Sequence, residues 1–250
     1  TNSYHTYYDT TWKTFTGNDL YMILKGPGSV TLPVTGVDKF GIKQLNPTRV
    51  GGQEWFSNFD NGIARTFDAY STSADGDTWL DTGHGSAFYT IDGKGKMVAN
   101  GDYVRMYMYN PNKTEWKNDK EITFYHTRLS ETQMLSYSGT QIFVNTNHGV
   151  GYAEDNILCP DRGYGAKPNL AGNWAFEKET AHHLNNGYAD SSGLSGGSKK
   201  EFVAGMPFNT PIGVKYIIKE LANKQVRLEL YVDRTNGLNG GDWKFVVGVT

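Results

Sequence analysis

The sequence has a single cysteine, no surplus of positive charge and no long apolar run, and each shortage excludes a class of protein. With Cys159 as its one cysteine, the chain forms no intrachain disulfide. Its 24 basic and 26 acidic residues give a net charge of −2, whereas phosphate binding requires a cationic surplus, so nucleic acid is excluded as a partner. No stretch approaches the ~20 apolar residues of a membrane-spanning helix, and we expect no membrane partner.

Helical periodicity is also nearly absent, and alternating strand-like segments take its place. Thirty glycines and sixteen tyrosines favour many turns and aromatic strands. Asp92-Gly93 predicts one hairpin turn, and a second is expected near Asn223. We therefore predict an all-β fold, a two-sheet antiparallel β-sandwich of the jelly-roll type, as a single domain over residues 1–250. The strand-like end, KFVVGVT, is compatible with a truncated C-terminus.

Strand alternation separates an apolar face from a face of aromatic, amide and charged side chains. Trp174 and Phe176 point toward the core, so Glu177 and Glu179 point away from it. Lys178 has the core-side parity, and we expect it at the edge of a sheet. The opposite face is predicted to carry Tyr103, Arg105, Tyr107, Tyr109, Tyr125, Gln141, Asn145, Asn147, Glu177 and Glu179.

Strands that are close in sequence often neighbour each other in a sheet, so we expect these side chains to share one concave face. Aromatic rings stack on the apolar faces of sugar rings, while amides and carboxylates pair with hydroxyl groups. The face is therefore typical of a protein that binds a polysaccharide chain. His182, which follows the Glu177 strand, is expected at the rim as a further sugar contact.

The same residues also have structural explanations. Tyrosine and threonine are common on exposed strands because of their β-propensity alone. Glu177 and Glu179 could simply face lysines across the sheet. An acidic loop with Asp75, Asp77 and Asp81 could hold a structural calcium ion through oxygen ligands, although it lacks the spacing of an EF-hand. No cofactor is required by any of these readings.

Two further features bear on where the protein acts. The chain begins at Thr1 without a methionine, and Asn112-Lys113-Thr114 forms one glycosylation sequon. From these features we expect a processed, secreted protein, and we expect it to be a monomer.

The order of the strands VRMYMY, TQIF and KYIIKEL…LELYVD resembles that of the concanavalin-like jelly rolls, over residues 80–250. Within them it is most similar to the polysaccharide lyases that cut alginate and glucuronan. Those lyases carry an arginine strand, a Gln-Ile-His strand and a Tyr-x-Lys strand. Arg105 matches the arginine, Gln141-Ile142-Phe143 keeps the glutamine but replaces the histidine, and Lys215-Tyr216-Ile217 is a partial match to the third motif.

The resemblance implies a lyase that acts on an acidic polysaccharide by β-elimination. Such an enzyme removes the proton at C5 of a uronic acid after neutralising the neighbouring carboxylate. Arg105 and Gln141 would neutralise it, with Asn145 and Asn147 beside them. Tyr107, Tyr125 or His148 would move the proton. Arg105 or Lys178 would lower the pKa of a tyrosine base.

Two alternatives use the same face. A retaining glycoside hydrolase would use Glu177 and Glu179, whose Cα atoms lie ~6.5–7 Å apart as positions i and i+2 of a strand. Retaining hydrolysis needs carboxyl groups ~5–5.5 Å apart, which this spacing allows without requiring it. A carbohydrate-binding module without catalysis would need only the rings, Tyr107 and Tyr109 among them, and the amides. The motifs favour the lyase over the module, and both over the hydrolase.

Overall fold

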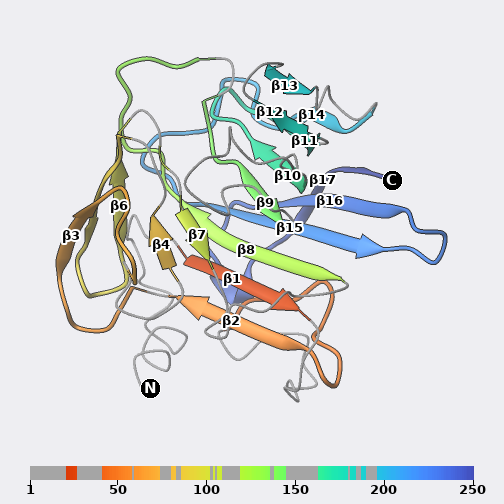
Figure 1. Cartoon of the computed structure of the whole chain (residues 1–250), viewed down its shortest axis with the longest axis horizontal. Helices are drawn as coiled ribbons and strands as arrows, with labels where there is room; N and C mark the ends of the chain where they lie inside the picture. The colour runs from red at the N-terminus through yellow and green to blue at the C-terminus, as the bar shows by residue number, and fades with distance from the viewer. Residues whose placement is uncertain are drawn as a thin grey trace. The chain divides into compact units, whose positions relative to one another are not determined.

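The computed structural model describes most of the chain, and its secondary structure there is almost entirely β. It describes residues 21–26, 41–57, 59–73, 80–82, 86–101, 104, 106–108, 119–135, 138–144, 163–179, 181–183, 187–189 and 196–250. These ranges contain strands, turns and one short 3-10 helix, η3 (Leu238–Gly240), but no α-helix (Figure 1). The registers of the sheets are antiparallel. The predicted all-β antiparallel class is confirmed. No helix in these ranges could cross a membrane.

The chain divides into two compact units, which are described separately. Unit 1 comprises Thr1–Thr127, Thr210–Lys215 and Asp233–Trp243, and unit 2 comprises Arg128–Asn209, Tyr216–Val232 and Lys244–Thr250. Strand β15 begins in unit 1 and ends in unit 2.

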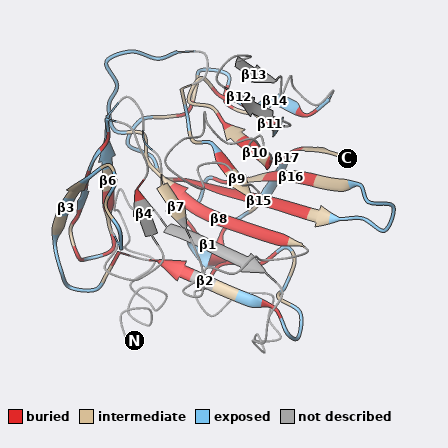
Figure 2. Cartoon of the chain, in the orientation of Figure 1, coloured by how far each residue is buried: buried red, intermediate tan, exposed pale blue. Residues whose placement is uncertain are grey.

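Unit 1 contains one end of the largest sheet. In it the start of β15 is followed, in strand order, by β8, β1 and β2. The bounds are β1 (Tyr21–Gly26), β2 (Gln53–Ser57), β8 (Lys120–His126) and β15 (Ile212–Glu220). Strand β8 is buried along nearly its whole length (Figure 2), so both of its faces are covered.

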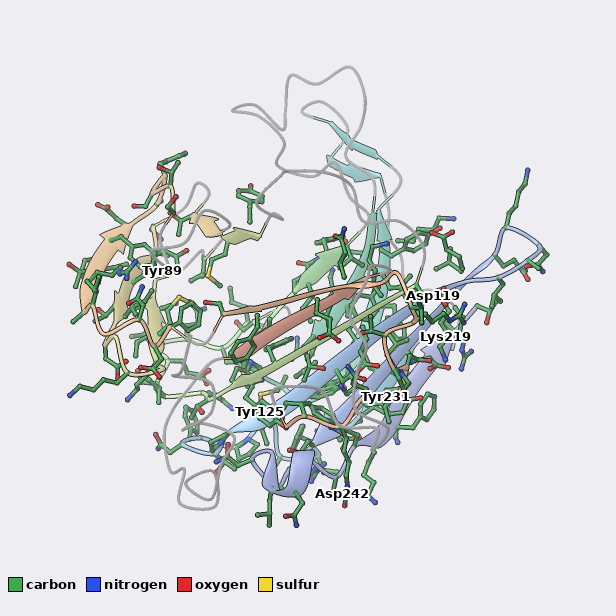
Figure 3. All side chains as sticks on the ribbon, turned by 90° about the horizontal axis from the view of Figure 1, so that it is seen from below. Tyr89, Asp119, Tyr125, Lys219, Tyr231 and Asp242 are labelled. Carbon is green, nitrogen blue, oxygen red and sulfur yellow. The ribbon has the colours of Figure 1, made fainter. Side chains whose placement is uncertain are left out.

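Unit 1 also holds a three-stranded sheet, β3–β5–β6, and a two-stranded sheet, β4–β7. The bounds are β3 (Arg65–Asp68), β4 (Leu80–Thr82), β5 (Phe88–Ile91), β6 (Met97–Asn100) and β7 (Met106–Met108). The predicted turn at Asp92-Gly93 joins β5 to β6, where the Asp92 amide donates to the Lys96 carbonyl over 3.1 Å. Tyr89, labelled in Figure 3, belongs to a small core beneath this sheet, and the Phe67 ring stacks on it at 4.9 Å.

Unit 2 is built on a four-stranded sheet of order β14–β11–β10–β9, on a hairpin β12–β13, and on the rest of β15 with β16 and β17. The bounds are β9 (Ile142–Val144), β10 (Gly163–Pro168), β11 (Asn173–Glu179), β12 (Ala181–His183), β13 (Gly187–Ala189), β14 (Ser198–Lys200), β16 (Val226–Asp233) and β17 (Lys244–Val249). The predicted turn near Asn223 joins β15 to β16, closed by the Leu221 amide on the Gln225 carbonyl at 2.8 Å.

The prediction that the candidate strands share one sheet face is wrong. Tyr107 lies on β7, which pairs with β4, and Tyr125 lies on β8 in the largest sheet. Glu177 lies on β11 of the four-stranded sheet, and Gln141 directly precedes β9 of the same sheet. The strand β10, of sequence GYGAKP, lies between β9 and β11. Glycine and proline are rare in strands, so the composition of this segment did not predict a strand.

Candidate functional site

One face of the four-stranded sheet collects polar side chains around an aromatic ring. Gly165 is the register partner of both Phe143 on β9 and Glu177 on β11, so these three residues share a face. Lys167 has the same parity as Gly165 on β10, and Gln141, which directly precedes β9, lies two residues before Phe143. We call these residues, Gln141, Phe143, Gly165, Lys167 and Glu177, the polar face.

The opposite face of the sheet is core. Trp174 and Phe176 are 0% and 2% exposed, and Ala166 is fully buried beside them. The rings of Trp174 and Phe202 lie 6.0 Å apart. The predicted alternation of β11 is thus confirmed, because apolar residues fill one side and Glu177 lies on the other.

Glu177 is the centre of the polar face. The side-chain amide of Gln141 donates to its Oε2 over 2.8 Å, and the Lys167 ammonium forms an ion pair with the same oxygen. Although it points away from the core, Glu177 is only 4% exposed. The Lys167 side chain is 41% exposed and that of Glu177 is 5% exposed, so the lysine is the member of the ion pair whose side chain reaches solvent. The cross-strand lysine explanation given above is therefore confirmed for Glu177.

The Phe143 ring lies over Gly165. A Cβ added to Gly165 would come within 3.0 Å of Cε1 and 3.1 Å of Cζ of that ring, and within 3.4 Å of Cβ of Glu177. Because Gly165 has no side chain, the Phe143 ring can pack directly against its backbone. Phe143 is half-buried, which leaves part of its surface accessible beside the amide and the ammonium.

Lys178 does not belong to the polar face. It is exposed, has the parity of Trp174 and Phe176, and its ammonium lies 5.9 Å from the centre of the Tyr164 ring. On that same face the Tyr216 hydroxyl donates to the Tyr164 carbonyl over 3.2 Å. Burial raises the pKa of Tyr216 well above its usual value, and Tyr164 adds to the effect.

Tyr125 is buried, and the prediction that it lies on an open face is wrong. Tyr125, labelled in Figure 3, is 1% exposed. Its hydroxyl donates to Oδ2 of Asp233 over 2.9 Å in unit 1. Asp233 is itself 0% exposed. The tyrosine has the parity of a polar face, but its partner lies 108 residues further along the chain, which no local pattern of β8 reveals.

A buried charge pair beside Tyr125 was missed by sequence reasoning. The Lys215 ammonium on β15 contacts Oε1 of Glu121 and donates to Oγ1 of Thr123 over 2.7 Å. It also lies 4.5 Å from the centre of the Trp243 ring. The position of Lys215 inside the apolar run GVKYII could have predicted this pair, because a charge within a buried strand requires a partner.

The remaining sequence-predicted residues are placed only in part. Tyr107 is half-buried on β7, opposite Asp81 in the register. Glu179 ends β11 and His182 lies in β12, without described side chains. The residues outside the described ranges are Tyr103, Arg105, Tyr109, Asn145, Asn147, His148 and, of the acidic loop, Asp75 and Asp77.

In the described part of the chain, no three His, Cys, Asp or Glu residues form a group able to hold a metal ion. No family model, no curated protein and no solved structure matches this chain. The proposals below therefore rest on the geometry of the site and on the sequence motifs.

Proposed function

We propose that the protein is a secreted, monomeric β-sandwich protein that binds a uronic-acid-containing polysaccharide on the polar face. The observation that supports this is the convergence of the Gln141 amide and the Lys167 ammonium on one carboxylate oxygen, beside the Phe143 ring. A ring, an amide and an accessible cation are the groups that an acidic sugar needs.

The chemistry of recognition divides among these residues. The ring of Phe143 offers an apolar surface for the CH face of a pyranose. Lys167 supplies a partly exposed positive charge for the sugar carboxylate. Gln141, which is exposed, can donate to a carboxylate and accept from a hydroxyl.

Polysaccharide lyase activity is a second candidate, and the same convergence favours it. A side-chain amide has two N–H donors and an ammonium has three, so Gln141 and Lys167 can contact a substrate carboxylate while they keep their contacts with Glu177. Such contacts lower the barrier to removal of the C5 proton. A base would take that proton, and the electrons would expel the oxygen at C4, which is then protonated. His148 and Arg105 are the proposed base and additional neutraliser. Tyr125 is no longer part of the proposal, since its hydroxyl is held by buried Asp233.

The contacts of Glu177 do not support the hydrolase alternative. Glu177 would have to give up contacts with Gln141 and Lys167 to act as an acid or a nucleophile. A hydrolytic acid instead needs a less polar setting, without a cation at its carboxylate.

Binding and elimination are tested together. The wild-type protein is incubated with alginate and with glucuronan, and retention of the protein in native gels that contain each polymer is measured. Ultraviolet absorbance reports the unsaturated product in parallel. We expect retention by the two acidic polymers, and a rising absorbance if the protein is a lyase.

Two matched lysine variants locate the site. Lys167→Met should weaken binding of the acidic polymers about tenfold, because one ligand-facing charge is lost. Lys178→Met, which removes a charge from the other face of the same strand pair, should leave binding unchanged. Equal effects of the two variants, or retention of no acidic polymer by the wild type, would contradict the proposal.

A further inference from the structure

The sheet β3–β5–β6 of unit 1 has one face on a core and one face in solvent. Tyr89, Ile91 and Met97 pack on the core side. The residues of the opposite parity form the solvent-facing side of the sheet, which we call the outer row face, and they surround a single aromatic ring. The outer row face consists of Thr66, Asp68, Phe88, Thr90, Val98 and Asn100, of which all but half-buried Val98 are exposed.

The register aligns three of these residues in one row across the strands. Asp68 on β3 is the partner of Phe88 on β5, and Phe88 is the partner of Asn100 on β6. Neighbouring strands lie ~4.8 Å apart, so Asp68 and Asn100 are the cross-strand neighbours of Phe88, one on either side. Phe88 is 52% exposed, which leaves its ring accessible from the solvent side.

A packing role does not account for this row. The core under the sheet is filled from the other face by Tyr89, Ile91 and Met97. In the described part of the chain, no hydrogen bond, ion pair or ring contact involves the side chains of Asp68, Phe88 or Asn100. The ring therefore lies between two polar groups that have hydrogen-bonding capacity to spare.

We propose that the outer row face binds a neutral polysaccharide, with one pyranose stacked on Phe88 between Asp68 and Asn100. The CH groups of a pyranose with equatorial substituents match the ring face, and its edge hydroxyls lie where a carboxylate accepts and an amide donates or accepts. Asp68 is the one charged side chain of this face as defined above, and like-charge repulsion disfavours a uronate there. The site is independent of the polar face, which lies in unit 2.

The test is isothermal titration of the full chain with cellohexaose, a neutral probe, and with a mannuronate hexamer, an acidic probe. Phe88→Ala should weaken cellohexaose binding about tenfold, whereas Phe88→Trp should retain it. The matched control is Phe245→Ala, which removes a 50% exposed phenylalanine from β17 in unit 2 and should leave cellohexaose binding unchanged. Circular dichroism verifies that each variant is folded.

Asp68→Asn distinguishes a sugar contact from a nonspecific apolar contact. It should weaken cellohexaose binding by a few fold, because an accepting carboxylate is stronger than an amide. Mannuronate binding should weaken by the same factor when Lys167→Met is introduced into Asp68→Asn as when it is introduced into the wild type. Wild-type protein that does not bind cellohexaose, or binding that Phe88→Ala leaves intact, would overturn this inference. Either result would leave the proposed acidic site standing, since Lys167→Met tests that site separately.

Discussion

At the scale of single residues, Asp233 organises the loop that follows β16. Its carboxylate accepts hydrogen bonds from the amides of Thr235, Gly237 and Asp242 over 3.0, 2.7 and 2.9 Å, and from the Tyr125 hydroxyl. Every donor of this set compensates the burial of a charge that would otherwise be unfavourable. Tyr125 is thus one of several residues that hold the loop.

Tyr125→Phe tests whether this tyrosine is structural or catalytic. The variant leaves Asp233 with its other donors, so we expect the free energy of unfolding to fall by about 1–2 kcal/mol. Polysaccharide binding, and any elimination activity, should match the wild type. Urea unfolding measures the first effect and the polymer assays the second. Loss of elimination with unchanged stability would return Tyr125 to the role of base.

His126 gives the protein a specific pH dependence. Burial lowers its pKa from 6.5 to about 4, so the unfolded state binds the proton more readily than the folded state. Its contribution to stability is therefore complete above about pH 6.5 and is lost as the pH falls toward 4. The wild type should lose more stability between pH 7 and pH 4.5 than His126→Phe does, as measured by urea unfolding. Parallel losses in both proteins would contradict this explanation.

At the scale of elements, the turn between β10 and β11 depends on one glycine. Gly172 has φ of 93°, and a Cβ there would overlap the carbonyl oxygen of Phe202. Gly172→Ala should therefore lower the free energy of unfolding by roughly 3–5 kcal/mol, from left-handed strain and overpacking together. Gly196 is the matched control. It has φ of 77° and open space around the added atom, so Gly196→Ala should lose only about 1–2 kcal/mol. Equal losses in urea unfolding would refute the steric argument.

The pairing of β8 with β15 in unit 1 includes the buried charges of Glu121 and Lys215. Their side chains are 2% and 1% exposed, and the second oxygen of Glu121 accepts from the Asn46 amide over 2.8 Å. Lys215→Met should be destabilising by roughly 3–5 kcal/mol because it leaves a carboxylate buried without its cation. Adding Glu121→Leu should recover part of that loss. A double-mutant cycle measures the coupling, and strictly additive effects would mean that the two charges do not stabilise each other.

Sequence patterns predicted the local features of these elements and failed at the long-range ones. The turns at Asp92-Gly93 and near Asn223 and the alternation of Trp174, Phe176 and Glu177 follow from neighbours within a few residues. The burial of Tyr125 depends on a distant aspartate, and the contacts of Glu177 depend on the unrecognised strand β10. Pairing between distant strands is set by packing of the whole sheet, which composition and period do not encode.

At the scale of the whole molecule, the two units carry surfaces of different chemistry. The polar face in unit 2 presents an accessible ammonium, whereas the outer row face in unit 1 presents a carboxylate. Acidic and neutral sugars should therefore be bound by separate residues of one chain. A polysaccharide that contains both kinds of sugar would be a natural ligand for such a protein under the two proposals.

Titration of isotopically labelled protein with a mannuronate hexamer, followed by NMR of the backbone amides, tests the central claim most directly. We predict that the largest shift changes fall on and beside β9, β10 and β11, with Gln141, Phe143 and Gly165 among them, and that Lys167→Met raises the hexamer concentration needed to produce them about tenfold. Lys178→Met should leave the pattern intact. Changes confined to other strands, or no changes in a hexamer titration that reaches millimolar concentration, would contradict the assignment of the polar face as the acidic-sugar site.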